Sequence, residues 1–280
     1  MNDAEREDLP SPAVSVPCLA QRDGVSFATT RLVPDEQAVA FTFNGSTHAV
    51  MMATLADLED FAVGFALTEG LIEGRDEIES LDVVTLPLGI EIRVWLKDER
   101  AKTYAQRRRS MAGPTGCGLC GIESLEAAMR ETPSVASAQI RFTPQAITTA
   151  MAALEPGQKL NDATHAVHAA GFFTEAEGLV ALREDVGRHN ALDKLIGALV
   201  RSGRTAAAGF VLTTSRVSIE LIQKAARLDA PVLVAVSAPT AAAIRLAEDC
   251  GMTLVAVARR QDFEIFTHPE RLTTASRNVA

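Results

Sequence analysis

The 280-residue sequence contains few cysteines, few aromatic residues and no long apolar run. Four cysteines are too sparse for a disulfide-stapled secreted scaffold, so we expect a protein of the reducing cytoplasm. The longest strand-like apolar runs, such as 232–236, are far shorter than the roughly 20 residues that cross a bilayer, so membrane insertion is not expected. Residues 1–24 begin with a polar, acidic stretch that lacks the apolar core of a signal peptide, and we expect a mobile tail.

Basic residues are also in the minority. The chain has 27 Lys and Arg against 36 Asp and Glu, a formal net charge of -9. A protein that binds nucleic acid neutralises phosphates with a net basic surface, so nucleic acid is excluded as the main partner. A local basic patch can still bind a smaller anion. The content of 47% hydrophobic and 22% charged residues is typical of a folded globular protein.

The first part of the chain is predicted as an α+β subdomain, residues 25–143. Asn44-Gly45 separates two strand-like runs, 39–43 and 47–52, which is a strong signal for an antiparallel hairpin. A helix is expected around 58–65, with Gly70 available to end it, and two further strands around 81–86 and 91–96. Residues 97–115 have no apolar period, so most of this stretch is interpreted as a mobile connection. Together with the two cysteines at its end, it forms a predicted mobile loop over 97–121.

The last part, residues 144–280, is predicted as an α/β subdomain. A helix is expected to start at Pro144 with Thr143 as its cap. The β-rich runs 209–214, 232–236 and 253–257 alternate with helical segments, which predicts a parallel sheet. In open α/β sheets, ligands bind beyond the carboxyl ends of the strands. Hydroxyl and guanidinium groups follow these three strands, at 214–216, 237–240 and 258–260, so a phosphate-bearing ligand is expected there.

The most specific chemical signal is the pair Cys117 and Cys120, enclosed by glycines in the stretch 116–121. Glycine permits an exposed, tightly turning backbone. A helix is expected to follow over 122–129, and its N-terminus, together with Arg107 to Arg109, would favour the thiolate form. Three interpretations stay open at this point: a zinc site completed by His165 and His168, a dithiol redox centre, and a thiolate that carries sulfur as a persulfide.

A second dense segment runs from Asp185 to Gly197. It is either an ordinary amphipathic helix with Asn190 as its cap, or a functional segment whose Arg188, His189 and Lys194 bind an anion while Asp185 and Asp193 orient them. His165 and His168 are equally well explained as polar residues at the end of the apolar strand 166–173. The two remaining cysteines, Cys18 and Cys250, are expected to be buried apolar side chains.

Several segments occur together and in order: Gly64-Phe-Ala-Leu-Thr-Glu-Gly-Leu-Ile72, Cys117-Gly-Leu-Cys120-Gly121, His168-Ala-Ala170, Asp185-Val-Gly-Arg-His-Asn-Ala-Leu-Asp-Lys-Leu-Ile-Gly197, Arg216-Val-Ser-Ile-Glu220, Ser237-Ala-Pro-Thr240 and Thr267-His-Pro269. This combination resembles the FdhD family of formate dehydrogenase accessory sulfurtransferases, over about residues 25–275. The resemblance implies a cytidine deaminase-like layered α/β C-terminal part with parallel strands, joined to an N-terminal α+β part with an antiparallel hairpin.

The resemblance also implies a function. A cysteine desulfurase would load sulfur on Cys117 as a persulfide, with Cys120 as its partner thiol, and the sulfur would pass to the Mo-bis molybdopterin guanine dinucleotide form of the molybdenum cofactor before insertion into formate dehydrogenase. Homodimerisation is likewise implied. The family's cofactor-binding stretch falls on Val257, Ala258, Arg259, Arg260, Gln261 and Asp262. The alternative is a non-catalytic cofactor-binding chaperone with a structural zinc site.

The sequence departs from the family pattern at two places. Thr214-Ser215-Arg216 stands where the family commonly has Ser-Gly-Arg, and Gln261-Asp262 stands where it often has Gly-Arg. The His-x-Glu and Pro-Cys-x-x-Cys zinc signature of the deaminases is missing, so deaminase activity is not expected.

Overall fold

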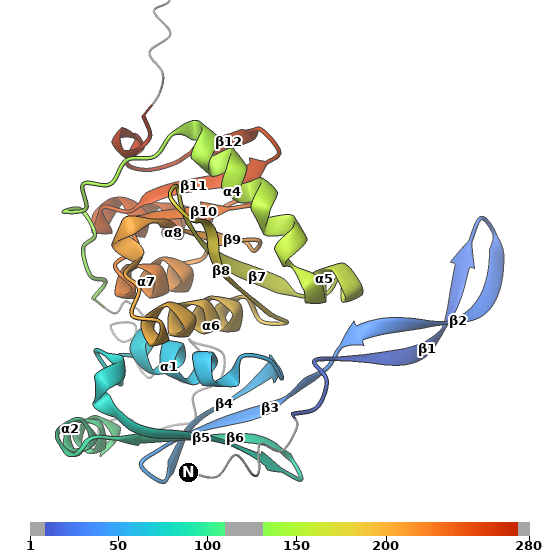
Figure 1. Cartoon of the computed structure of the whole chain (residues 1–280), viewed down its shortest axis with the longest axis horizontal. Helices are drawn as coiled ribbons and strands as arrows, with labels where there is room; N and C mark the ends of the chain where they lie inside the picture. The colour runs from blue at the N-terminus through green and yellow to red at the C-terminus, as the bar shows by residue number, and fades with distance from the viewer. Residues whose placement is uncertain (1–8, 110–130, 274–280) are drawn as a thin grey trace, which may run out of the picture.

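The computed structural model describes residues 9–109 and 131–273. Within these ranges the chain forms a two-stranded, a four-stranded and a six-stranded sheet. Figure 1 shows the layers: a long helix, the six-stranded sheet, a layer of helices and the four-stranded sheet follow one another, and the two-stranded sheet extends away as an arm. The expected mixed α/β fold, with an antiparallel hairpin and a sheet of parallel strands, is confirmed.

The arm consists of β1 (Ala13–Arg22) and β2 (Val25–Pro34), which pair antiparallel along their whole length. The prediction of a mobile tail over 1–24 is therefore wrong from residue 13 onward. Asp23 and Gly24 both have positive φ, 49° and 81°, the geometry of a two-residue hairpin turn, so this Asp-Gly pair is the sequence signal for the arm. Cys18 is exposed instead of buried, because it lies on the arm, away from the core.

The four-stranded sheet has the order β4-β3-β6-β5. Its strands are β3 (Glu36–Phe43), β4 (Ser46–Thr54), β5 (Ile78–Leu86) and β6 (Gly89–Leu96). The predicted Asn44-Gly45 hairpin is confirmed, with φ values of 48° and 72°. The predicted helix is α1 (Leu58–Thr68), whose Phe61 and Phe65 lie 4.9 Å and 4.5 Å, centroid to centroid, from the Phe41 ring. The short 3₁₀ turn η1 (Arg75–Glu77) leads into β5.

The interpretation of residues 97–115 as a mobile connection is wrong for its first part, where α2 (Asp98–Arg109) forms. This helix has no apolar stripe, which is why periodicity missed it. It is held instead by Tyr104, whose ring lies 5.8 Å from that of Phe43, and by Arg100, which donates to the backbone carbonyls of Gly70 and Leu71. The rest of the predicted loop, 110–121, lies outside the described residues.

The six-stranded sheet has the order β12-β11-β10-β9-β7-β8, and β9, β10 and β11 are parallel, as predicted. Its strands are β7 (His168–Thr174), β8 (Gly178–Asp185), β9 (Phe210–Thr213), β10 (Val232–Ala235), β11 (Thr253–Arg259) and β12 (Asp262–Ile265). Successive side chains face opposite layers: Leu212, Val234 and Val255 belong to one core cluster, and Val211, Leu233 and Leu254 to the other. Burial on both faces explains the continuous apolar runs in these strands.

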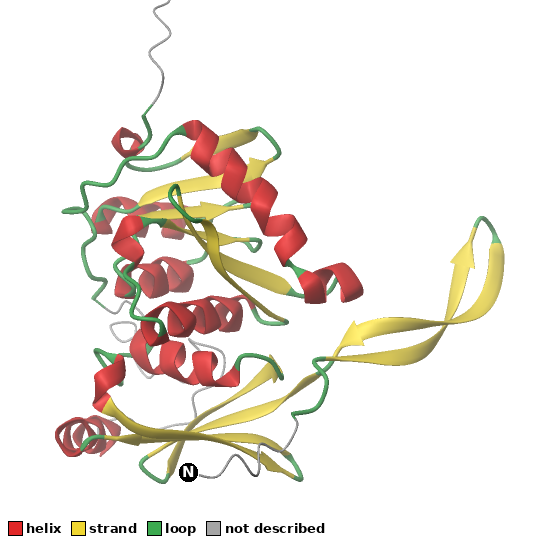
Figure 2. Cartoon of the chain, in the orientation of Figure 1, coloured by secondary structure: helices red, strands yellow, loops and turns green. Residues whose placement is uncertain are grey.

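Helices cover both faces of this sheet (Figure 2). One face carries α6 (Arg188–Arg201), α7 (Ile219–Arg227) and α8 (Ala241–Cys250), and the other carries α4 (Pro144–Gly157), followed by α5 (Lys159–Thr164). The predicted cap of α4 is confirmed, because Thr143 Oγ1 accepts from Ala146 N at 3.1 Å. The 3₁₀ turns η2 (Ala206–Ala208) and η3 (Pro269–Arg271) precede β9 and follow β12.

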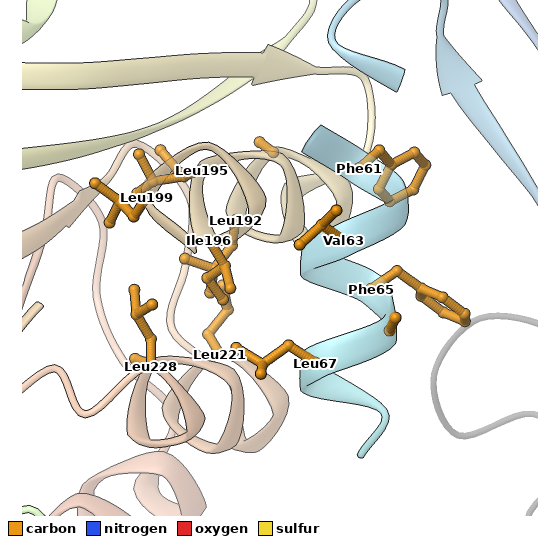
Figure 3. Packing of buried hydrophobic residues seen from close by; sticks show 14 of the residues in the cluster. Phe61, Val63, Phe65, Leu67, Leu192, Leu195, Ile196, Leu199, Leu221 and Leu228 are labelled. Carbon is orange, nitrogen blue, oxygen red and sulfur yellow. The ribbon is translucent and has the colours of Figure 1, made fainter. Parts of the chain in front are cut away.

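The centre of the molecule is the junction of α1, α6 and α7, where Leu67, Leu192 and Leu221 point toward one another (Figure 3). Here α1 and α6 cross at two glycines. A Cβ at Gly64 would lie 1.8 Å from the Asp193 carbonyl oxygen, and a Cβ at Gly197 would lie 1.8 Å from that of Asp60. Only glycine at both positions allows the two backbones to approach so closely. This crossing joins the four-stranded sheet to the six-stranded sheet through one continuous core.

Candidate functional site

The carboxyl ends of β8, β9, β10 and β11 all lie at one edge of the six-stranded sheet, here called the carboxyl edge. The residues after β9 and β10 continue side by side: Val217 N donates to Ala238 O at 3.4 Å, and Thr240 N donates to Val217 O at 2.9 Å. The segment after β9 is also tied to β7, because Thr214 N donates to Ala169 O at 3.0 Å. The loops at this edge are therefore fixed relative to one another.

Three arginines at the carboxyl edge point to an anionic ligand. Arg216, Arg259 and Arg260 are exposed, and none of their guanidinium groups makes an ion pair or hydrogen bond to the residues that the structure describes. Arg216 follows β9 and Arg259 ends β11, two strands away, so their backbones are separated by roughly 10 Å. In a chain with net charge -9, unpaired cations gathered at one edge favour a ligand that carries phosphates.

The predicted cofactor-binding stretch, residues 257–262, lies at this same edge. The β-rich run predicted over 253–257 is longer in the structure. Strand β11 continues to Arg259 and turns through Arg260 and Gln261 into the antiparallel strand β12, so part of the stretch belongs to these strands. Pairing is irregular between Ala256 and Arg259, and Val257 has a φ of 53°. Left-handed backbone is strained for a β-branched residue, and such strain gathers at functional sites.

The hydroxyl groups predicted to bind phosphate mostly have structural partners. Thr214 Oγ1 accepts from Ala169 N at 2.9 Å, and Ser237 Oγ donates to Thr214 O at 3.2 Å. Thr240 Oγ1 caps α8 by accepting from Ala243 N at 3.2 Å. These three side chains hold the edge together, so the exposed arginines are the better candidates for anion contacts.

The segment 185–197 forms α6, but two roles predicted for it are wrong. Lys194 is not an anion donor, because its side chain is fully buried and its Nζ lies 2.6 Å from Asp185 Oδ2. Burial lowers the pKa of Lys194, and the Asp185 carboxylate opposes that shift. Asn190 is not the helix cap either: α6 begins at Arg188, and Asn190 Nδ2 donates to Met52 O and to Asp185 Oδ1.

Asp193 has a comparable structural role. Its carboxylate accepts from Lys224 Nζ at 2.8 Å and from Thr68 Oγ1 at 2.8 Å, which ties α6 to α7 and to α1. Burial raises the pKa of Asp193, and the charge of Lys224 opposes that shift. The two acidic residues of the segment therefore fix the first turns of α6 in place.

Arg188 and His189, the first two residues of α6, retain the predicted capacity to bind a ligand. Arg188 Nε and His189 Nε2 are buried atoms without a hydrogen-bond partner in the described part of the chain, and so is Ser218 Oγ, at the start of α7. His168 lies at the start of β7, on the same edge, and burial together with the charge of Arg188 lowers the pKa of His168. In the sequence, Ser218 is interpreted at most as a helix cap and Glu220 only as part of a family motif; their position just after a parallel strand is the signal for a functional role.

His189 should make stability depend on pH. Burial, reinforced by the positive charges of Arg188 and Lys224 and opposed by Glu220, lowers the pKa of His189 to about 4. The unfolded chain binds a proton at this ring below about pH 6.5, whereas the folded chain does so only below about pH 4, so stability falls as pH decreases through this window. We expect protonation of His189 in the unfolded chain to lower the free energy of unfolding by about 2 kcal/mol between pH 7.5 and pH 5.

The measurement is the free energy of urea unfolding at both pH values. In the variant His189→Gln the loss of stability on acidification should shrink by that amount, while His168 and the other groups keep their own contributions. An unchanged pH dependence in the variant would show that His189 does not titrate as its surroundings dictate.

No metal site is evident in the residues that the structure describes: they contain no group of three or more His, Cys, Asp or Glu side chains able to hold a metal ion. Cys117 and Cys120 lie outside the described residues, so both the zinc interpretation and the assignment of the reactive cysteines stay predictions. His165 is exposed in left-handed backbone at the end of α5, and His168 is half-buried. Cys250 is buried, as predicted. No helix in the described ranges is both long and apolar enough to span a bilayer.

The fold and the carboxyl edge define a layered α/β protein that presents unpaired cations beyond the ends of parallel strands. The model of the FdhD/NarQ family matches residues 34–273, and the chain belongs to this family. It is 54% identical over 253 residues to "Sulfur carrier protein FdhD" of Agrobacterium fabrum, covering 90% of this chain and 93% of the relative. It is 52% identical over 254 residues to the protein of the same name from Brucella abortus, with 91% and 94% covered.

A solved structure has the same fold. A protein from Desulfotalea psychrophila, described as a formate dehydrogenase accessory protein, superposes with a TM-score of 0.72 over 93% of this chain and 99% of its own, at 24% sequence identity. The resemblance found in the sequence motifs is therefore confirmed at the level of the family and of the fold.

Proposed function

We propose that this protein is a sulfurtransferase for formate dehydrogenase maturation, which carries sulfur as a persulfide on Cys117. The sulfur comes from the persulfide of a cysteine desulfurase and passes to the Mo-bis molybdopterin guanine dinucleotide cofactor, the substrate, before its insertion into formate dehydrogenase. Membership of a family whose relatives are named sulfur carrier proteins supports this proposal. Binding of the cofactor is supported by the unpaired guanidinium groups at the carboxyl edge, which can contact its phosphates.

The chemistry of the first step is a thiol exchange. The Cys117 thiolate attacks the outer sulfur of the donor persulfide, the bond between the two donor sulfurs breaks, and the donor thiolate leaves. Cys120, three residues after Cys117 in the sequence, is the candidate thiol for resolving the Cys117 persulfide. Arg216, Arg259 and Arg260 would pair with phosphates of the cofactor, and the tied loops of the edge would hold them in place.

Replacing Cys117 with alanine is expected to abolish activation of formate dehydrogenase, because the thiol that is proposed to carry the sulfur is then missing. Intact-protein mass spectrometry after incubation with a desulfurase and cysteine should show a sulfur adduct in the wild type, mapped to Cys117, and none in Cys117→Ala. The matched control is Cys18→Ala, which removes an exposed cysteine on the arm and should leave loading and activation unchanged.

Full activation of formate dehydrogenase by Cys117→Ala would refute the carrier assignment. Stoichiometric zinc in the purified protein, lost on mutation of His165 or His168, would instead favour the non-catalytic chaperone.

A further inference from the structure

A group of polar side chains at the start of α6 and α7 is not accounted for by phosphate binding. It consists of Arg188 and His189 on α6 and of Ser218 and Glu220 at the start of α7, and is here called the α6–α7 cluster. His189 Nε2 lies 4.0 Å from Glu220 Oε2, which is too far for a hydrogen bond. The unpartnered buried atoms of Arg188, His189 and Ser218 belong to the same cluster. Buried polar atoms without partners are rare in folded proteins and call for a ligand or a bound water.

The cluster is rigidly mounted. Asp193 follows His189 by four residues and Lys224 follows Glu220 by four, so each lies one helical turn behind, on the same face. The ion pair between Lys224 Nζ and Asp193 Oδ2, at 2.8 Å, therefore fixes the first turns of α6 and α7 relative to each other. The cluster is prearranged rather than assembled by a ligand.

The cluster remains accessible, since 24% of the His189 side chain and 20% of the Glu220 side chain is exposed. Its charges argue against a phosphate. Burial raises the pKa of Glu220, but Ser218, the Glu220 backbone amide and the charges of His189 and Arg188 outweigh burial and hold the pKa below its ordinary value. An ionised carboxylate here would repel a phosphate group.

A carboxylate beside a guanidinium suits a ligand with donors and an acceptor on one edge. An ionised carboxylate only accepts hydrogen bonds, and a guanidinium only donates them. The 2-amino-4-oxopyrimidine edge, which guanine and pterin share, offers a ring N–H and an amino group to the carboxylate and a carbonyl oxygen to the guanidinium. Charged side chains at such an edge give strong discrimination between bases.

We infer that Glu220 and Arg188 read the 2-amino-4-oxopyrimidine edge of the cofactor, with Glu220 accepting from the ring N–H and the amino group and Arg188 donating to the carbonyl oxygen. This inference rests on the proposed function, in which a guanine- and pterin-bearing cofactor binds at the carboxyl edge. It separates two tasks: the exposed arginines hold phosphates, and the α6–α7 cluster selects the ring.

The test is isothermal titration of the full-length protein with two matched pairs of probes: GDP and XDP, and pterin and lumazine. In each pair the second compound has an oxygen where the first has the amino group. The wild type should bind at least one amino compound about tenfold or more tightly than its oxo partner, because the carboxylate would face an oxygen instead of a donor. Selectivity within the GDP pair identifies guanine as the ligand, and selectivity within the pterin pair identifies pterin.

Glu220→Gln should reverse that preference, because the Gln amide can donate to the oxo group while a carboxylate cannot. Arg188→Gln should weaken both members of a pair without reversing the preference. The matched control is Glu248→Gln, the same exchange in the last turn of α8, at the opposite edge of the sheet, which should change no affinity. Circular dichroism would verify that each variant is folded.

A Glu220→Gln protein that is folded and keeps the wild-type preference would overturn the inference, as would a wild type that binds both members of each pair equally or binds none of them. Sulfur loading on Cys117 would be unaffected by those results, so the proposed function would stand on that step. Conversely, if Glu220→Gln reverses the preference but the protein never loads sulfur, the proposed sulfur transfer is refuted and the ring-binding site stands.

Discussion

Gly64→Ala is expected to destabilise the protein by more than about 3 kcal/mol, although alanine is the better helix former by about 1 kcal/mol. The added Cβ would lie 1.8 Å from the Asp193 carbonyl oxygen and 2.8 Å from the Gly197 nitrogen, and both are backbone atoms that cannot rotate away. Relief requires α1 and α6 to separate, which disturbs the core on both sides of the crossing. The measurement is the free energy of urea unfolding.

The matched control for this prediction is Gly157→Ala, at the end of α4. There the nearest atom to the new Cβ is the Leu182 Cδ1 methyl, at 3.0 Å, which can move, so a change within about 1 kcal/mol is expected. Gly197→Ala meets the Asp60 carbonyl oxygen at 1.8 Å and should be as damaging as Gly64→Ala. Similar stability of the Gly64 and Gly157 variants would mean that the helices do not cross as closely as described.

The same glycines show what sequence patterns can predict and what they cannot. Alternation of apolar runs with helical segments is a local signal, and it predicted β9, β10 and β11 as parallel strands that end at one edge. A close helix crossing is a contact between residues more than 120 positions apart, and no local pattern carries it. Gly64 and Gly197 were visible only as parts of family motifs, without a physical role.

The prediction for 97–115 failed for a related reason. Apolar periodicity detects a helix only when the helix buries a stripe, and α2 is held by Tyr104 and by hydrogen bonds of Arg100 to carbonyls about thirty residues earlier. At the arm, by contrast, the signal is local: Asp23-Gly24 has the same turn chemistry as Asn44-Gly45, which correctly predicts a hairpin.

For the candidate site, sequence reasoning located the edge but could not assign its side chains. Arg188 and Lys194 are both cations of the same helix, six residues apart, yet Arg188 has an unpartnered nitrogen at the carboxyl edge and Lys194 is fully buried against Asp185. Which cation meets a ligand depends on the tertiary surroundings of each one. The residues that would carry sulfur, Cys117 and Cys120, stay a prediction from their motif.

The buried pair of Lys194 and Asp185 leads to the second large expected effect. Lys194 Nζ donates to Asp185 Oδ2 and to the carbonyl and hydroxyl of Thr54, while Asp185 also accepts from the backbone nitrogens of Thr54 and Gly187 and from Asn190. The pair thus joins β4 to the start of α6. Removing one partner leaves an uncompensated buried charge, so Lys194→Met should cost about 3–5 kcal/mol at neutral pH.

A double variant identifies the cause of that loss. Asp185→Asn removes the buried charge that Lys194→Met leaves without a partner. Asp185→Asn combined with Lys194→Met should therefore be more stable than Lys194→Met alone at neutral pH. The matched control is Arg204→Met, which breaks the exposed pair with Glu177 and should change the stability far less, because water and salt screen exposed charges. A double variant no more stable than Lys194→Met would show that the loss comes from packing and hydrogen bonds instead of from the unpaired charge.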